Sequence, residues 1–231
     1  MGKVSLVNGI LENNSVLYNL SSISNILLYH GQSMEKILMK FPNIRKLKFH
    51  LFVSKDCVPY CSRIVKMDHL SRLESLSVTL MWAQKCRLQF HFPSSLRKLH
   101  LFFFSWNMIS RIWELPNLEV LTLSSDSADK ERTWEIPVEV EFPNLRILHL
   151  RSLGITRWTG SGDHFPRLQK LILQSCGMKE IPSCLGSTST LEKIEVRWCS
   201  PSVESLVREI QEEQDTEDLQ IDIRCRKQPR I

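Results

Sequence analysis

The sequence predicts an α/β solenoid in which parallel strands stack side by side, and three observations lead to that prediction. The pattern L-x-x-L-x-L is written three times, in FPNLRILHL, FPRLQKLILQSC and STLEKIEVRWC. Successive copies begin 23 residues apart, at Leu145, Leu168 and Leu191. Cys176 and Cys199 close the second and third copies, where Asn or Cys is typical. A fixed period of this size with this consensus is the signature of leucine-rich repeats.

The same pattern continues toward the amino terminus with irregular spacing. Clear copies begin at Ile44, Leu73, Leu96 and Leu118, so the chain has seven, separated by 29, 23, 22, 27, 23 and 23 residues. A degraded copy starts at Leu20, because Asn25 stands where the third apolar residue belongs. A single repeat cannot bury its own apolar face, so the repeats must stack to form a continuous core. We expect a horseshoe with a parallel sheet on its concave side and irregular loops and short helices on its convex side.

These copies divide the chain into segments of one predicted domain. We expect a single leucine-rich-repeat domain over residues 1–231, with a degraded leading repeat in 1–43 and clear repeats in 44–199. Residues 200–231 should form a carboxyl-terminal cap of one helix and one strand. Ser200 and Pro201 suit a helix start, and Leu219, Ile221 and Ile223 alternate as in a strand. No comparable cap is evident at the amino end.

Two further features concern the segments between strands. The insert at 125–141 carries six acidic and two basic residues, which predicts a solvated loop on the convex side or edge. Phe or Leu followed by Pro recurs just ahead of the strands, and proline directs the chain into extended geometry. We expect the residues before these prolines to form an internal spine: Phe41, Phe92, Leu115, Phe142 and Phe165.

Composition and cysteine usage exclude several classes of protein. The 231 residues are 42% hydrophobic and 24% charged, as in an ordinary globular protein. No apolar run approaches the roughly 18 residues of a membrane span, and the first residues lack the apolar core of a signal peptide. Seven scattered cysteines suggest reduced thiols in a cytoplasmic protein, with peripheral association with membranes left open. Cys57 and Cys61, near His69, match no strong zinc pattern, so we predict no metal.

Motifs for catalysis are also missing from the sequence. None of the seven histidines or of the Ser and Asp residues falls in a nucleophile elbow, a metal-binding helix motif or a glycine-rich phosphate cradle. His50, His100 and His149 each lie on the polar side of a predicted strand, which the repeat itself explains. We therefore predict that the chain is not an enzyme and needs no cofactor.

In place of a catalytic site, the strands are expected to form a surface that can bind another protein. Residues that alternate with the buried ones should project from the concave face, where Lys, Arg and His are frequent and Glu195 is the only acidic residue in the seven clear copies. We select as candidate protein-binding residues Lys46, Lys48, His50, Lys98, His100, Phe102, His149, Arg151, Lys170, Gln174, Lys193 and Arg197. Such a face would suit an acidic protein surface, and we do not expect nucleic acid as the partner because aromatic stacking platforms are sparse. The alternative is that the lysines only keep the solenoid soluble.

The run from FPNLRILHL to CSPSVESLVREIQEE resembles the carboxyl-terminal leucine-rich-repeat region of plant intracellular nucleotide-binding disease-resistance proteins, of the solanaceous late-blight-resistance type. The resemblance is strongest over residues 142–215, and the chain looks like a truncated relative. It implies a recognition domain that senses a pathogen effector and restrains a switch domain, in defence and hypersensitive cell death. The implied partners are that switch domain in cis, an effector or a guarded host protein. The only Gly-Lys pair is Gly2-Lys3, outside any phosphate-loop motif, so ATP binding is not carried over.

Two other functions stay open on the sequence. An extracellular repeat receptor would show regular 24-residue spacing and many glycosylation sequons, whereas only Asn13 and Asn19 are sequon candidates here. A substrate-recruiting subunit of a ubiquitin ligase would carry an F-box upstream of the repeats. We keep the second of these as the alternative to the immune-receptor interpretation.

Overall fold

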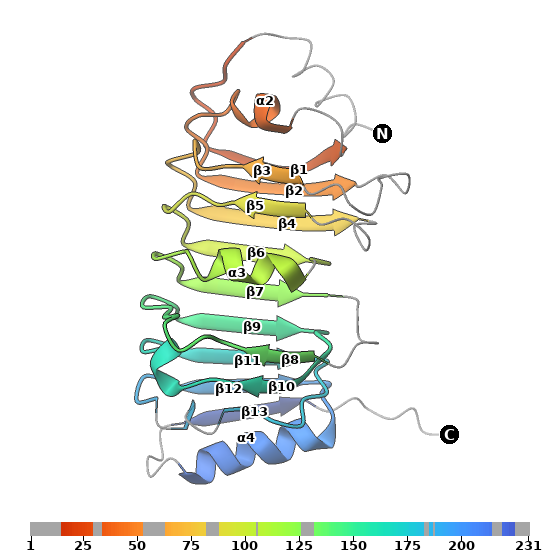
Figure 1. The fold of residues 1–231 in the computed structure, drawn as a ribbon, viewed down its shortest axis with the longest axis vertical. Coiled ribbons are helices and arrows are strands. Elements are labelled where there is room, and N and C mark those ends of the chain that lie inside the picture. The colour runs from red at the N-terminus through yellow and green to blue at the C-terminus, as the bar shows by residue number, and fades with distance from the viewer. Residues whose placement is uncertain are drawn as a thin grey trace, which may run out of the picture. The chain divides into compact units, whose positions relative to one another are not determined.

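The computed structural model describes residues 15–29, 34–52, 63–81, 88–104, 106–125, 132–182, 185–186, 188–213 and 219–224. The chain forms two compact units, residues 1–117 and residues 118–231. Each unit is an α/β leucine-rich-repeat solenoid with one main parallel sheet, which confirms the predicted fold class (Figure 1). The predicted segment boundaries at residues 43 and 199 stay predictions.

The first unit is built on four parallel strands in chain order. They are β1 (Ser22–Tyr29), β2 (Lys46–Phe52), β4 (Ser75–Met81) and β6 (Lys98–Phe102). Equivalent residues of successive repeats lie side by side, since Leu47 pairs with Leu76 and Leu76 with Leu99. The returning segments hold a second parallel pair, β3 (Arg63–Lys66) and β5 (Leu88–His91), and the short helices α2 (Met34–Leu38), η2 (Trp106–Met108) and α3 (Ile109–Ile112). In Figure 1 the arrows of β3 and β5 point opposite to those of the main strands.

The second unit repeats this plan with five parallel strands. They are β7 (Val120–Ser124), β9 (Ile147–Arg151), β11 (Lys170–Gln174), β12 (Lys193–Arg197) and β13 (Gln220–Arg224). Its returning segments contain the parallel pair β8 (Arg132–Glu135) and β10 (Ile155–Thr159), the short helix η3 (Gly162–His164) and the longer helix α4 (Pro201–Glu213). Register is unbroken from β9 through β13, so whole repeats are superimposed without a shift.

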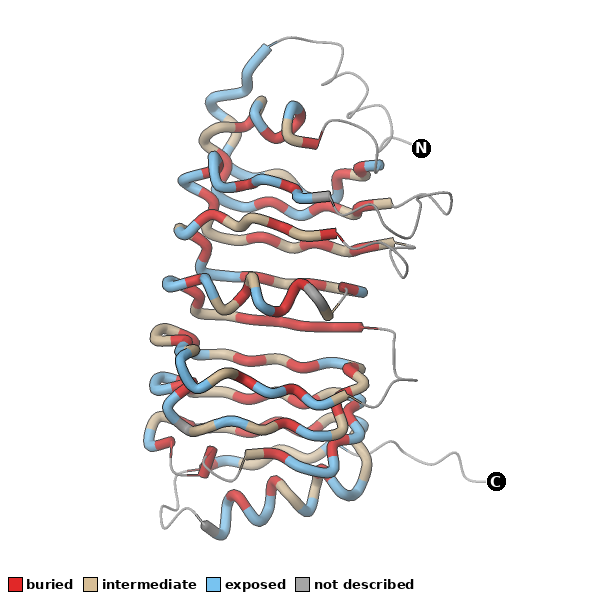
Figure 2. The backbone as a smooth tube through the Cα atoms, viewed as in Figure 1, coloured by how far each residue is buried: buried red, intermediate tan, exposed pale blue. Residues whose placement is uncertain are grey.

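The core of each unit follows from the period-two alternation of its strands. Leu148, Leu150, Leu171 and Leu173 are all fully buried, while their neighbours along each strand are not (Figure 2). Burial of each leucine side chain stabilises the folded state by about 1.5–3 kcal/mol. The side chain is buried only when the next repeat covers it. The stability of the fold therefore depends on the stacking of the repeats.

The predicted spine before the prolines is largely confirmed. Phe41, Leu115, Phe142 and Phe165 are buried, and the rings of Phe142 and Phe165 stack with centroids 5.4 Å apart. Phe92 is the exception, because it is half-buried. Its ring stacks against Phe90 of β5, which is fully buried and takes the inner position.

The prediction of a solvated insert at 125–141 is wrong where the insert forms a strand, although Val138, Glu139 and Glu141 beyond it are exposed. Residues 126–131 lie outside the described residues, but Arg132–Glu135 forms β8, and Trp134 is 1% exposed. Its indole stacks on Trp158 of β10 with ring centroids 5.0 Å apart. Burial of two indoles outweighs the polar character of the surrounding segment.

The leading repeat is more regular than its sequence suggests. Asn25 adopts a left-handed conformation with φ 60°, and the pairing of β1 with β2 shifts between Ile23 and Ile26. Ile26 therefore pairs with Phe49 and takes the buried third position that Asn25 was expected to leave polar. A bulge of this kind inserts one residue without losing the strand, and Asn tolerates positive φ better than most residues.

The carboxyl-terminal helix and strand form as predicted. Helix α4 begins at Pro201, and Val203, Val207 and Ile210 are buried on one side of it. Strand β13 pairs with β12, but its Ile221 and Ile223 are only half-buried, because β13 lies at the edge of its sheet. Within the described residues, no helix is both long and apolar enough to cross a membrane.

Four strands are directly followed by a residue in the left-handed conformation, at equivalent places in the repeat. Phe103, Ser152, Ser175 and Trp198 directly follow β6, β9, β11 and β12, with φ between 49° and 59°. The amide of each of the last three donates to the carbonyl of the last strand residue in the next repeat, as from Ser152 to Gln174 at 2.8 Å. These bonds fix the point where the chain leaves the sheet.

Candidate functional site: the polar face of the sheet

The candidate residues lie on one side of each unit's strands, opposite the buried leucines; we call this side the polar face. In the first unit, Lys46, Lys48 and His50 follow one another along β2, and Lys98, His100 and Phe102 occupy the matching positions of β6. Strand β4 separates the two groups and contributes Ser75, Ser77 and Thr79. The lysines are exposed, while the two histidines and Phe102 are half-buried. These six candidates thus form two parallel rows across a neutral strand.

In the first unit, the charges of neighbouring lysines affect the protonation of a histidine on the polar face. The pKa of His100 is lowered, first because the imidazole is partly buried and then because Lys98 and Lys48 lie near it. A neighbouring positive charge disfavours protonation of the ring. His100 therefore adds little positive charge of its own, and the lysines determine the potential of this face.

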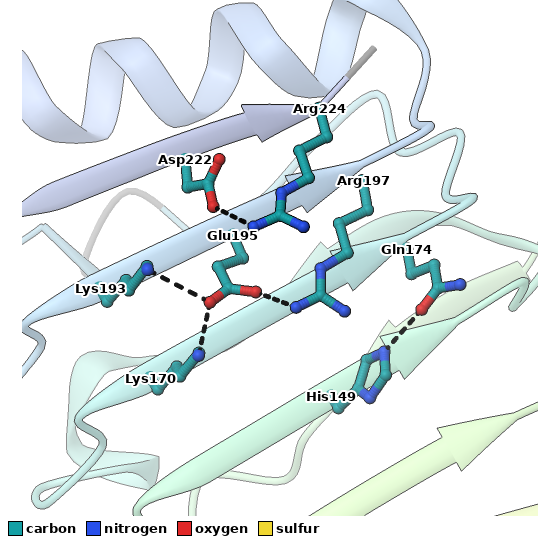
Figure 3. Close-up of polar contacts among 8 residues, drawn as sticks. All are labelled: His149, Lys170, Gln174, Lys193, Glu195, Arg197, Asp222 and Arg224. Carbon is teal, nitrogen blue, oxygen red and sulfur yellow. Dashed lines mark hydrogen bonds and ion pairs between the residues drawn. The ribbon is translucent and has the colours of Figure 1, made fainter. Parts of the chain in front are cut away.

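In the second unit the structure brings three of the six candidates into one cluster around Glu195 (Figure 3). The Glu195 carboxylate lies 2.5 Å from Lys170 Nζ and 3.3 Å from Lys193 Nζ, and its other oxygen binds Arg197 Nη2. Glu195 is 4% exposed, although the sequence placed it among the projecting residues. The expected basic row at this position is therefore partly neutralised by a carboxylate held beneath three cations.

The Glu195 carboxylate is strongly stabilised in its ionised form. Burial by itself raises its pKa, but hydrogen bonds from Lys170, Arg197 and Lys193 outweigh that effect and lower the pKa to about 2. Each of the three cations keeps about a third of its side chain exposed. The cluster retains a net positive charge and presents it to solvent.

The remaining candidates of the second unit flank this cluster. His149 Nε2 donates to Gln174 Oε1 at 3.2 Å, so these two candidates contact each other. Arg151 is exposed at the end of β9. The sequence selection missed Asp222 and Arg224, which pair at 3.1 Å on β13 and extend the face by one strand. The alternation of Leu219, Ile221 and Ile223 could have identified them.

The polar face is not uniformly open. Thr122 and Ser124 of β7 alternate with Leu121 and Leu123, and the pattern predicts that they project from this face, but both are buried. Their side chains are short, and the larger His149 and Arg151 lie beside them in register on β9. On β7, therefore, the short side chains of the polar face are not available for contact.

The described residues form no metal centre. Among them, no group of three His, Cys, Asp or Glu residues is placed to hold a metal ion. Cys57 and Cys61, considered above as metal ligands, lie outside the described residues. Cys176 and Cys199 have a structural setting, since the Cys176 amide donates to Cys199 Sγ at 3.4 Å and both thiols contact strand carbonyls.

Comparison with known proteins gives one consistent result. No family model matches the chain. It is 32% identical over 215 residues to the late blight resistance protein R1-A of Solanum demissum, covering 91% of this chain and 16% of that protein. Two putative late blight resistance protein homologues of the same plant, R1B-16 and R1B-12, are also 32% identical, over 218 and 209 residues. The chain spans about a sixth of the length of these relatives, and it is similar to one stretch of the late blight resistance proteins.

Proposed function

We propose that this chain acts in plant disease resistance as the recognition part of an immune receptor, and that its polar face contacts an acidic protein surface. The homology to late blight resistance proteins supports the role in resistance. The partner would be the receptor's own nucleotide-binding switch domain in the resting state, a pathogen effector or a guarded host protein. Contact with the switch domain would restrain it, and displacement by an effector would start defence and hypersensitive cell death.

The observation that carries the choice of surface is the excess of cations on the polar face of each unit. In the first unit, β2, β4 and β6 carry Lys46, Lys48 and Lys98 and no acidic residue. In the second, the positive side chains outnumber Glu195 and Asp222 by five to two: Arg151, Lys170, Lys193, Arg197 and Arg224. Complementary charge speeds encounter with an acidic partner and selects against basic ones.

Charge reversal tests this proposal. The variant carries Lys46→Glu, Lys48→Glu, Lys98→Glu and Arg151→Glu, and its binding in trans to the switch domain of a related receptor is measured at several salt concentrations. We expect at least about a tenfold loss of affinity and a weaker dependence on salt, because screened charge pairs are removed.

A matched control reverses the same number of charges away from the polar face. Lys36 on α2, Lys66 on β3, Lys179 in a returning loop and Arg208 on α4 are all exposed and suit this purpose. The control should bind as the parent chain does. Unchanged affinity and salt dependence in the polar-face variant would reject the electrostatic role and leave the lysines as a solvated surface.

A further inference from the structure

Two cysteines lie at equivalent places in adjacent repeats of the second unit. Cys176 is the second residue after β11, and Cys199 is the second residue after β12. The two are 23 positions apart, which is the repeat length, and the strands before them pair in register to their last residues. The consensus has Asn or Cys at this place. Two successive copies with Cys therefore bring two thiols together at the carboxyl ends of neighbouring strands.

The backbone fixes the approach of these two residues. The Ser175 amide donates to the Arg197 carbonyl at 2.8 Å, and the Ser200 amide donates to the Cys176 carbonyl at 3.2 Å. Between these two bonds, the Cys176 amide donates to Cys199 Sγ at 3.4 Å. Neighbouring strands lie about 4.8 Å apart, and a disulfide spans roughly 4.4–6.8 Å between Cα atoms. The spacing of the sheet thus suits a disulfide between equivalent residues of adjacent repeats.

The two thiols differ in their access to solvent. Cys176 is 3% exposed, whereas Cys199 is half-buried. Each sulfur lies near a carbonyl oxygen of the preceding repeat, Cys176 Sγ at 3.5 Å from that of Leu150 and Cys199 Sγ at 3.4 Å from that of Leu173. A reagent that arrives from solvent therefore meets Cys199 first, while Cys176 waits in the interior beside it.

Cys199 is also the more acidic of the two. Its pKa is lowered to about 7, first because the Cys176 thiol donates a hydrogen bond to it and further because the Cys176 amide does so. Partial burial and the negative charge of Glu204 on α4 act in the opposite direction. The hydrogen bond to Cys199, and then burial, raise the pKa of Cys176. Because the thiolate is the nucleophile, Cys199 is the reactive thiol of the pair near neutral pH.

We propose that Cys199 and Cys176 form an oxidation site, which reacts with a hydroperoxide and closes into a disulfide. The Cys199 thiolate attacks a peroxide oxygen, the O–O bond breaks, an S–O bond forms and hydroxide leaves, so that Cys199 becomes a sulfenic acid. The Cys176 sulfur then attacks the Cys199 sulfur, the S–O bond breaks, and the departing hydroxide takes the Cys176 proton and forms water. Two thiols are oxidised, and the peroxide is reduced by two electrons.

Closure requires a local rearrangement. The sulfur atoms of a disulfide are about 2.05 Å apart, so both side chains have to turn away from the strand carbonyls that they contact in the reduced chain. The site lies beyond the ends of β11 and β12 and uses no residue of the polar face. It therefore does not depend on the function proposed for that face.

Peroxide treatment of the reduced full chain tests the proposal, followed by blocking of free thiols, trypsin digestion and mass spectrometry. Trypsin yields the peptides 171–179 and 198–208, each with one of the two cysteines. We expect hydrogen peroxide to join these two peptides as the main cross-linked product, and dithiothreitol to release them.

The pH dependence of this reaction distinguishes Cys199 from an ordinary thiol. With a pKa of about 7, the rate should fall about fivefold from pH 7 to pH 6 and rise only about twofold from pH 7 to pH 9, as the thiolate saturates. A thiol with an ordinary pKa of about 8.5 would react more than about tenfold faster at pH 9 than at pH 7. A profile of that second kind would contradict the proposal.

Variants separate the two steps. Cys176→Ser should stop after the first step, with a sulfenic acid at Cys199 that dimedone traps, whereas Cys199→Ser should leave Cys176 unmodified at the same dose of peroxide. Cys184→Ser, a matched control on the peptide between the two sites, should still form the disulfide. Circular dichroism checks that each variant is folded, and the experiment on the unaltered chain needs no variant.

Three results would overturn the proposal. The first is the absence of the linked peptides after treatment of the native chain. The second is dimedone labelling of Cys176 in the Cys199→Ser chain. The third is cross-linking of the same pair at an equal rate in a chain unfolded by guanidinium chloride, since the fold would then not create the site.

Discussion

Replacing Glu195 with Gln removes the charge at the centre of the cluster in the second unit and keeps the shape of the side chain. The amide imitates the protonated acid. A fall of the Glu195 pKa from its ordinary 4.5 to about 2 corresponds to about 3 kcal/mol of stabilisation by the ionised form. Lys170, Lys193 and Arg197 are each about a third exposed, and solvent screens part of this. We expect Glu195→Gln to lower the free energy of unfolding by about 1.5–3 kcal/mol at pH 7.

The loss of stability caused by Glu195→Gln should depend on pH, in a direction set by the shift of the Glu195 pKa. Because the pKa of Glu195 is lowered by folding, its contribution is complete above about pH 4.5 and is lost as the pH falls toward 2. Urea unfolding of both chains, followed by circular dichroism, should therefore show a difference at pH 3 that is less than about half of that at pH 7. Asp222→Asn, which breaks the exposed pair with Arg224, is the control and should cost less than about 1 kcal/mol. A loss below about 0.5 kcal/mol at pH 7, or equal losses at the two pH values, would refute the reasoning.

Three further predictions concern the repeats. Leu148→Ala and Leu171→Ala should each reduce the free energy of unfolding by roughly 2–5 kcal/mol, because both side chains are fully buried between neighbouring repeats; losses below about 1 kcal/mol at both sites would contradict that packing. Asn25→Val should cost about 1–2 kcal/mol, since a β-branched residue fits poorly at φ 60°, whereas Asn25→Gly should be nearly neutral; chemical denaturation of both variants checks this, and equal losses would argue against the bulge. Amide hydrogen exchange should show the strongest protection between Leu96 and Ile223 and weaker protection in the first two repeats, because the described residues ahead of β1 form no helix or strand that covers them; uniform protection from Leu20 onward would contradict this.

The repeat pattern was enough to predict the strands and most of the core. Alternation within a strand is a local property, so the burial of Leu148 or Leu173 can be deduced without knowing any partner. The pairing of Trp134 with Trp158 depends on two returning segments in different repeats, which no single repeat encodes. The bulge at Asn25 is similar, because its effect appears only when β1 is aligned with β2.

The sequence predicted which side of the strands holds the candidate residues, but it did not predict the contacts that these side chains make with one another. The positions of the basic residues follow from the register, but the burial of Glu195 does not, because it depends on three long side chains folding over it. A signal was present in the sequence all the same. Lys170 and Lys193 are equivalent residues of adjacent repeats, and Glu195 and Arg197 follow Lys193 at intervals of two, so all four share one face. Cross-strand neighbours at this spacing are within reach of long side chains.

The unbroken register of β9, β11 and β12 also means that this part of the chain can change length in whole units. Removing residues 152–174, a stretch of 23, would join Arg151 to Ser175, which takes the same left-handed conformation as the deleted Ser152. Leu148 and Leu150 would then meet Ile194 and Val196, as Leu171 and Leu173 do in the intact chain. The set of strand side chains shown to solvent would change, and the returning segments would lose Trp158 and Phe165, which stack on Trp134 and Phe142. Recombination between copies can therefore change the polar face while the inward strand residues stay aligned, and its cost in stability falls on the contacts between returning segments.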